Sequence, residues 1–162
     1  MNTLYMDLFK SLEKDIKYCE HMLELLHSER QALTERNLEL LEQIVENKSQ
    51  VLLDMDKTQK VRDLLLNQLG FEPGSLGLKA VFQNPPAEFA DSIKEIEPKL
   101  SAMLQEITNM NKINSIMLST SYTQNSKVLD IILGRDTNQE TYGKDGLTES
   151  DTNKGSGKVT KV

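Results

Sequence analysis

Apolar side chains recur at steps of three and four residues over long stretches of this chain, which is the spacing of one helix face. The first stretch predicts a helix over about residues 3–36. Asn37 then offers a side-chain acceptor for the start of a second helix over about residues 38–69. Gly70 is expected to end that helix with a left-handed cap, with Phe71 folding back on it.

The segment over residues 70–86 is rich in proline and glycine but also carries large apolar side chains. We therefore expect it to pack as a lid, with a short helix from Ser75 to Phe82. A third helix is predicted over about residues 87–133, because proline is accepted in the first helical turn. Pro98 is expected to kink or break it.

These elements predict an all-α fold, an antiparallel bundle of three long helices in a domain of residues 1–134. The third helix is about 14 residues longer than the others, or about 20 Å at 1.5 Å per residue, so its C-terminal end is expected to protrude. Residues 135–162 contain only four apolar or aromatic side chains in 28 positions. We expect them to form a flexible, disordered tail.

The end of the third helix, VLDIIL, is unusually apolar. At 100° per residue its large apolar side chains spread over about 200° of the helix circumference, twice an ordinary core-facing stripe. One neighbouring helix cannot cover such an arc. The arc could fold back on the bundle or join two copies, but an exposed apolar patch more often marks a partner site. The residues are Val128, Leu129, Ile131, Ile132 and Leu133.

The distribution of charge along the chain limits the classes of ligand that the protein is expected to bind. Residues 1–134 hold 14 Lys and Arg against 20 Asp and Glu, while the tail holds 5 of each. Nucleic acid and anionic membranes both require a clustered basic surface, so neither is expected as a ligand. Apolar runs are too short for an integral membrane segment, and the N-terminus lacks a signal-peptide pattern. A cytoplasmic protein that binds other proteins is the expected class.

No catalytic or metal site is predicted. Glu24 and His27 have the Glu-x-x-His spacing of di-iron bundles, but the other histidine, His21, has no glutamate three residues before it. Cys19 with these histidines supplies too few ligands for zinc, and no phosphate-binding glycine loop follows a strand. We therefore expect no enzyme activity and no cofactor.

Four local motifs resemble the FlgN-type flagellar export chaperones over most of residues 1–147. Their order and spacing carry the resemblance more than any one of them. They are QALTERNLELLEQIVENKSQVL, LGFEPGSLGLKAVFQNPP, NKINSIML and LDIILGRDTNQETYGKDG.

The resemblance implies a cytosolic chaperone that binds the hook-associated junction proteins FlgK and FlgL, prevents their premature assembly and delivers them to the export gate protein FlhA. The end of the third helix is then the client-binding surface, with Met117 and Leu118 at its edge. Tyr142, with Gly143 and Gly146, matches the family position that contacts the export gate. The full client-binding set is Met117, Leu118, Val128, Leu129, Ile131, Ile132 and Leu133.

The alternative interpretation is a self-associating coiled-coil protein that builds rods. Polar residues on or beside the apolar stripes weaken a coiled coil made from identical copies, and this favours the chaperone. A chaperone of this kind is expected to be a monomer or a weak dimer, which sedimentation would distinguish from a rod. The interrupting residues are Arg30, Lys48, Asn111, Asn114 and Gln124.

Overall fold

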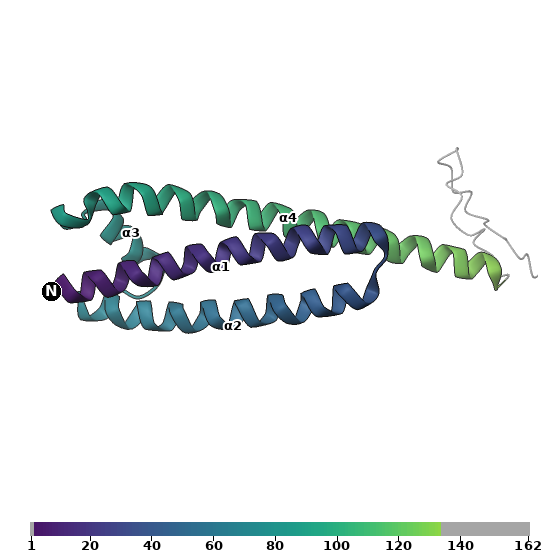
Figure 1. Ribbon diagram of the computed structural model, residues 1–162, viewed down its shortest axis with the longest axis horizontal. Helices are drawn as coiled ribbons and strands as arrows, with labels where there is room; N and C mark the ends of the chain where they lie inside the picture. The colour runs from purple at the N-terminus through teal and green to yellow at the C-terminus, as the bar shows by residue number, and fades with distance from the viewer. Residues whose placement is uncertain (1, 134–162) are drawn as a thin grey trace, which may run out of the picture. The chain divides into compact units, whose positions relative to one another are not determined.

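The computed structural model describes residues 2–133, and within that range every regular element is helical. Three long helices form a bundle in which α1 and α4 run in one direction and α2 in the other (Figure 1). This confirms the all-α antiparallel bundle. The elements are α1 (Asn2–Glu35), α2 (Leu38–Gln68), α3 (Ser75–Gln83), the short 3-10 helix η1 (Ala87–Phe89) and α4 (Ala90–Ile132).

The chain divides into two units, residues 1–123 and residues 124–162. The first unit contains the bundle. The second unit is described only for residues 124–133, which are the last turns of α4 and the residue after it. Within residues 2–133, we find no helix with the length and hydropathy required to cross a membrane.

A two-residue connection joins α1 to α2. Arg36 has a positive φ of 56°, and its N–H and that of Asn37 bond to the Leu33 and Ala32 carbonyls of the last turn of α1. Asn37 then caps the next helix, because its side-chain oxygen accepts the Leu40 N–H at 3.1 Å. One short turn therefore reverses the chain and satisfies both helix ends.

The end of α2 has the predicted left-handed glycine cap, and the following segment packs on the core as the predicted lid. Gly70 has φ 84°, and the Phe71 N–H bonds to the Leu66 carbonyl at 2.9 Å, as in a Schellman motif. The lid contains α3, whose Val81 is completely buried in the core. Gly77 of α3 lies so close to the Glu72 carbonyl that an added Cβ would be 1.8 Å from its oxygen.

The start of α4 differs from the prediction, because residues 87–89 form the 3-10 turn η1 and the α-helix begins at Ala90. Pro98 does not break the helix, which continues through it to Ile132. The position is exposed, so the Lys94 carbonyl that has no proline N–H to bind can be hydrated. This tolerance explains why α4 continues past Pro98.

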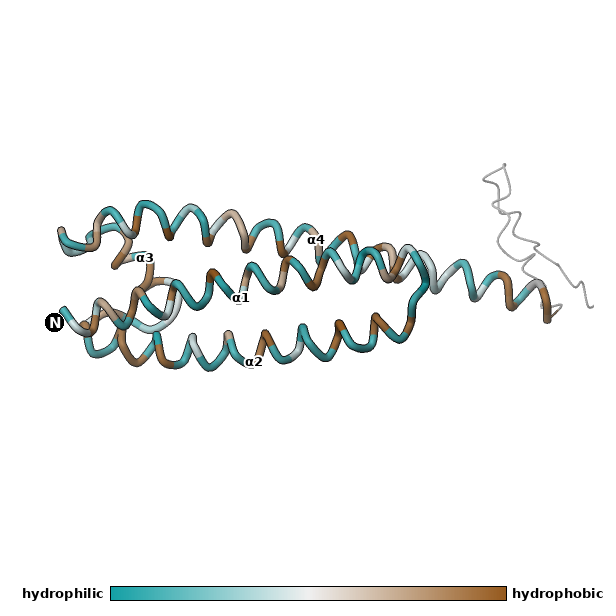
Figure 2. The backbone as a smooth tube through the Cα atoms, in the orientation of Figure 1, coloured by the Kyte–Doolittle hydropathy of each residue, from teal (hydrophilic) through white to brown (hydrophobic). Residues whose placement is uncertain are grey.

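The core of the first unit consists of two clusters of buried apolar side chains, and Met55 and Ile107 pack against both. Figure 2 shows hydrophobic positions recurring along α1, α2 and α4, as the sequence periodicity requires. The cluster nearer the N-terminus includes Val81 from the lid, and its edge carries the stacked rings of Phe9 and Phe89, 4.7 Å apart. Burying these faces holds the three helices together.

An ion pair joins α1 to α2 beside the first cluster. Arg62, which interrupts the apolar stripe of α2, binds the carboxylate of Asp15. Their side chains are only 14% and 8% exposed, and the second oxygen of Asp15, Oδ1, has no hydrogen-bond partner. Burial raises the pKa of Asp15 and the Arg62 charge opposes that rise. The structure thus places one buried, incompletely satisfied charge pair between two helices.

Candidate functional site

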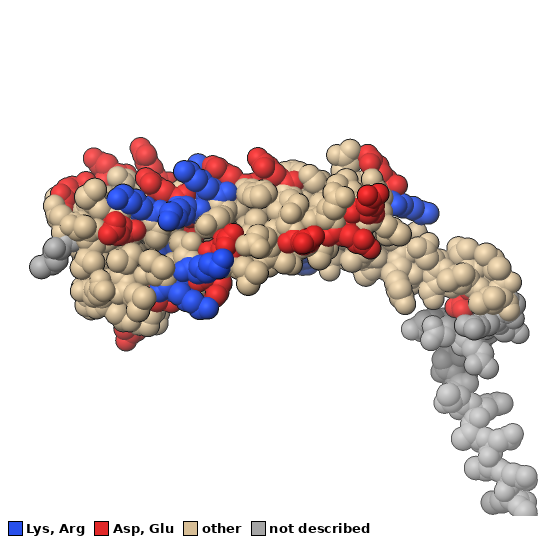
Figure 3. Space-filling model, turned by 60° about the horizontal axis from the view of Figure 1, so that its bottom comes forward, with Lys and Arg blue, Asp and Glu red and all other residues tan. Residues whose placement is uncertain are grey.

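The last turns of α4 expose a group of large apolar side chains. Val128, Leu129, Ile132 and Leu133 are 53% to 72% exposed. The Leu133 N–H bonds to the Leu129 carbonyl at 2.9 Å, so the helical hydrogen bonding reaches the end of the described chain. Lys127 and Asp130 are the only charged residues between 124 and 133, and this part is mostly uncharged in the face drawn in Figure 3.

Not every predicted site residue can be placed. The side chain of Ile131 lies outside the described part of the structure, as do Tyr142, Gly143 and Gly146. Met117 and Leu118 belong to the first unit, whereas Val128 to Leu133 belong to the second. Leu118 is exposed and Met117 is half-buried.

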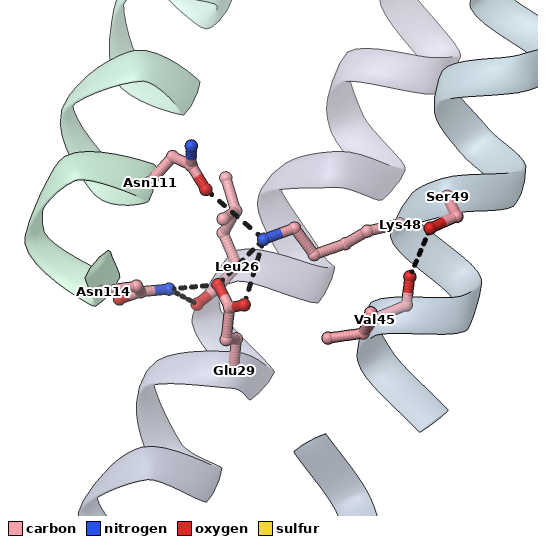
Figure 4. Close-up of polar contacts among 7 residues, drawn as sticks. All are labelled: Leu26, Glu29, Val45, Lys48, Ser49, Asn111 and Asn114. Carbon is pink, nitrogen blue, oxygen red and sulfur yellow. Dashed lines mark hydrogen bonds and ion pairs between the residues drawn. The ribbon is translucent and has the colours of Figure 1, made fainter. Parts of the chain in front are cut away.

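A polar network links all three long helices in the half of the bundle that contains the α1–α2 connection (Figure 4). Lys48 of α2 donates to both carboxylate oxygens of Glu29 of α1, each at 3.0 Å, and to Asn111 Oδ1 of α4 at 3.3 Å. Asn114 Nδ2 of α4 donates to Glu29 Oε2 at 2.8 Å and to the Leu26 carbonyl at 2.9 Å. Two residues that interrupt the apolar stripes, Lys48 and Asn114, therefore meet at the Glu29 carboxylate, and a third, Asn111, joins the network through Lys48.

The orientation of the Asn114 amide follows from its neighbours. The residue is 3% exposed and its nitrogen faces two acceptors, so a flipped amide would oppose oxygen to oxygen. Its own oxygen, Oδ1, has no partner. Buried polar networks fix how packed helices are aligned, because any shift leaves their groups unsatisfied. The sequence did not predict a role for Glu29, because a glutamate beside Arg30 is typical of a solvent-exposed helix position.

A groove lies beside this network and has a volume of about 670 Å³. Its walls come from the end of α1, the start of α2 and the middle of α4, all in the first unit. Five of the lining residues are aliphatic and three are glutamates. The aliphatic residues are Leu33, Leu38, Leu41, Val45 and Leu118, and the glutamates are Glu29, Glu42 and Glu46.

Reactive groups are not gathered at either surface. Cys19 is completely buried in the core, and burial raises its thiol pKa, with the charges of Asp15 and Glu20 adding to the effect. A thiol with a raised pKa stays protonated and is a poor nucleophile. Over residues 2–133, His, Cys, Asp and Glu form no group of three or more that could hold a metal ion.

An exposed apolar helix end and a groove with aliphatic lining are features typical of helical proteins that bind other proteins. Comparison with protein families matches residues 1–150 to the family described as FlgN protein, so the chain belongs to the FlgN family of flagellar export chaperones. No curated protein and no solved structure matched the chain.

Proposed function

We propose that this chain binds the hook-associated junction proteins FlgK and FlgL in the cytoplasm, prevents their premature assembly and delivers them to the export gate protein FlhA. Membership of the FlgN family supports a role in flagellar export, with flagellar proteins as partners. The particular clients and the gate component belong to this proposal.

The observation that carries the proposal is the apolar end of α4. Val128, Leu129, Ile132 and Leu133 are each more than half exposed, and few charges accompany them. An amphipathic helix of an unassembled subunit would cover this surface and would itself be kept from water. We include Ile131 in the client-binding set, and Met117 and Leu118 at its edge.

The test is a client-binding measurement with Leu129→Ala combined with Ile132→Ala. Burying one such side chain fully stabilises a complex by about 1.5 to 3 kcal/mol. Leu129 is 56% exposed and Ile132 is 72% exposed, so more than half of this effect is still available to a client, and the pair should weaken binding at least about tenfold. Helicity and unfolding midpoint should stay near wild type, because the removed atoms are largely exposed.

A matched control comes from α2, where Leu53 and Leu64 are comparably exposed. Changing both to Ala should leave client affinity within about twofold, since neither belongs to the proposed client-binding set. Equal losses in the two double variants would contradict the proposal. A collapse of helicity in the α4 variant would mean that its residues stabilise the fold instead of holding a client.

We assign the gate contact to Tyr142, which is followed by Gly143 and Gly146, because it matches the position that contacts the export gate in the FlgN family. A tyrosine also offers a large contact area at low entropic cost. Tyr142→Ala should leave client affinity within about threefold and reduce binding of the loaded complex to FlhA. Equal gate affinity for the free protein, the loaded protein and the loaded variant would eliminate this role. Growth of the sedimenting species with concentration would instead favour the rod-forming alternative.

A further inference from the structure

The groove of the first unit lies beside an apolar strip on α2 that has the length of a helix-docking site, and two residues of this strip, Leu38 and Val45, line the groove. Leu38, Val45 and Leu52 are seven residues apart on α2, and each is more than half exposed. Seven residues are close to two helical turns, so these side chains form one strip about 20 Å long. Leu41 and Leu118 face the same hollow from α2 and α4.

The edge of the groove is acidic. The first turns of α2, residues 38–47, contain three glutamates and no lysine or arginine. Glu42 and Glu46 line the groove and are exposed, and in the described structure neither forms an ion pair. The nearest lysine on this helix, Lys48, is already held by Glu29 and Asn111 (Figure 4). Glu42 and Glu46 therefore place negative charge at the groove that no ion pair within residues 2–133 neutralises.

We propose that this groove binds an amphipathic helix of a partner protein, with apolar side chains at heptad spacing flanked by lysine or arginine. Apolar side chains of the partner would cover Leu38, Val45 and Leu118, while its basic side chains would reach Glu42 and Glu46. Charge pairs at the edge of such a contact guide association and select the partner. Leu118 lines the groove and also lies at the edge of the proposed client-binding set, but residues 38–46 take no part in the client contact, so this proposal goes beyond it.

Charge also argues against a second copy of this chain as the occupant. Residues 1–134 carry six more acidic than basic side chains, and the groove edge is itself acidic. Like charges that face one another across an interface oppose association. A basic partner helix relieves the repulsion that a second copy would increase.

The test uses the full chain and three fluorescent synthetic peptides of equal length. One has leucines on one helix face and lysines on the other, the second replaces each lysine with glutamate, and the third scrambles the first. Anisotropy titrations should give the leucine–lysine peptide at least tenfold tighter binding than the other two. Similar affinity for the glutamate peptide would overturn the proposal, because the acidic edge would then select nothing.

Variants then locate the binding site. Leu38→Ser with Val45→Ser should weaken leucine–lysine peptide binding at least tenfold. The control pair Val61→Ser with Leu64→Ser, whose side chains are also more than half exposed on α2 but lie outside the groove, should weaken it less than twofold. Glu42→Gln with Glu46→Gln should weaken binding several-fold at low salt and little at high salt. Equal losses for both serine pairs would overturn the proposal.

Two further measurements keep the outcomes separate. Circular dichroism should show unchanged helicity for the serine variants, whose wild-type side chains are largely exposed. Sedimentation should show the same mass for wild type and the Leu38→Ser, Val45→Ser variant. A wild-type dimer that this variant converts to monomer would overturn the proposal in favour of a second copy. Leu118 is common to the groove and the client-binding set, so the tests change only residues that belong to one of them: Leu129 and Ile132 for the client, Leu38 and Val45 for the peptide. A loss of client binding through Leu129 and Ile132 should leave the peptide result unchanged, so the two proposals can fail separately.

Discussion

The buried ion pair between Asp15 and Arg62 makes a sharp prediction about stability and pH. Substituting Arg62→Met removes the positive charge and keeps an apolar stem of similar length, so the main effect is to leave the Asp15 carboxyl buried without its partner. Burial already raises the pKa of Asp15 above 3.8, and Arg62 is the group that opposes this rise. The variant should raise that pKa further.

The loss of stability in Arg62→Met has an upper limit, because the buried Asp15 carboxylate can avoid the cost of an unpaired buried charge by taking up a proton. One pKa unit corresponds to about 1.36 kcal/mol, so protonating a group of unfolded pKa 3.8 costs about 4 kcal/mol at pH 7 and about 1.6 kcal/mol at pH 5. For an acid whose folded pKa is raised, stability is fully present below the unfolded pKa and is lost as pH rises toward the folded pKa. The destabilisation by Arg62→Met should therefore shrink as pH falls.

Urea unfolding followed by circular dichroism at pH 7 and pH 5, each against wild type, measures this effect. Asp15→Asn should cost nearly the same at both pH values, because the guanidinium it leaves unpaired cannot lose its proton. The double variant Asp15→Leu, Arg62→Met should lie within about 1 kcal/mol of wild type or above it, since replacing a buried pair by apolar groups is often neutral. An equal loss for Arg62→Met at both pH values would refute the reasoning.

Two further predictions concern backbone geometry. Arg36→Gly should stabilise the protein by about 1 kcal/mol and raise the unfolding temperature by about 3 °C, because a residue other than glycine is strained at a φ of 56°. The control Thr34→Gly, inside α1, should lower the unfolding temperature, and a lower unfolding temperature for both variants would contradict the strain at Arg36. Gly77→Ala should lower the free energy of unfolding, measured in urea, by about 1 to 3 kcal/mol, because its Cβ would collide with the Glu72 carbonyl. Leu76→Ala, on the exposed side of α3, should change it by no more than about 0.5 kcal/mol, and equal effects would show that the lid backbone moves to accommodate the added Cβ.

Local features of the sequence were sufficient to predict several helix ends. Asn37 caps α2, and Gly70 with Phe71 closes its other end, because capping depends on residues within one or two turns. The left-handed Arg36 carried no such signal, since an arginine is an unusual choice for that conformation. The α-helical start at Ala90, after a 3-10 turn, was also outside what proline placement could predict.

Only the tertiary structure decided which polar residues meet. The sequence marked Lys48, Asn111 and Asn114 as interruptions of apolar stripes. The fold brings Lys48 and Asn114 to Glu29, which no pattern had singled out, and Asn111 to Lys48. Periodicity tells which face of a helix is apolar, but not how far one helix slides or rotates against another. For the same reason the apolar end of α4 was visible in the sequence, whereas the acidic groove formed by three separate segments became visible only when those segments were packed together.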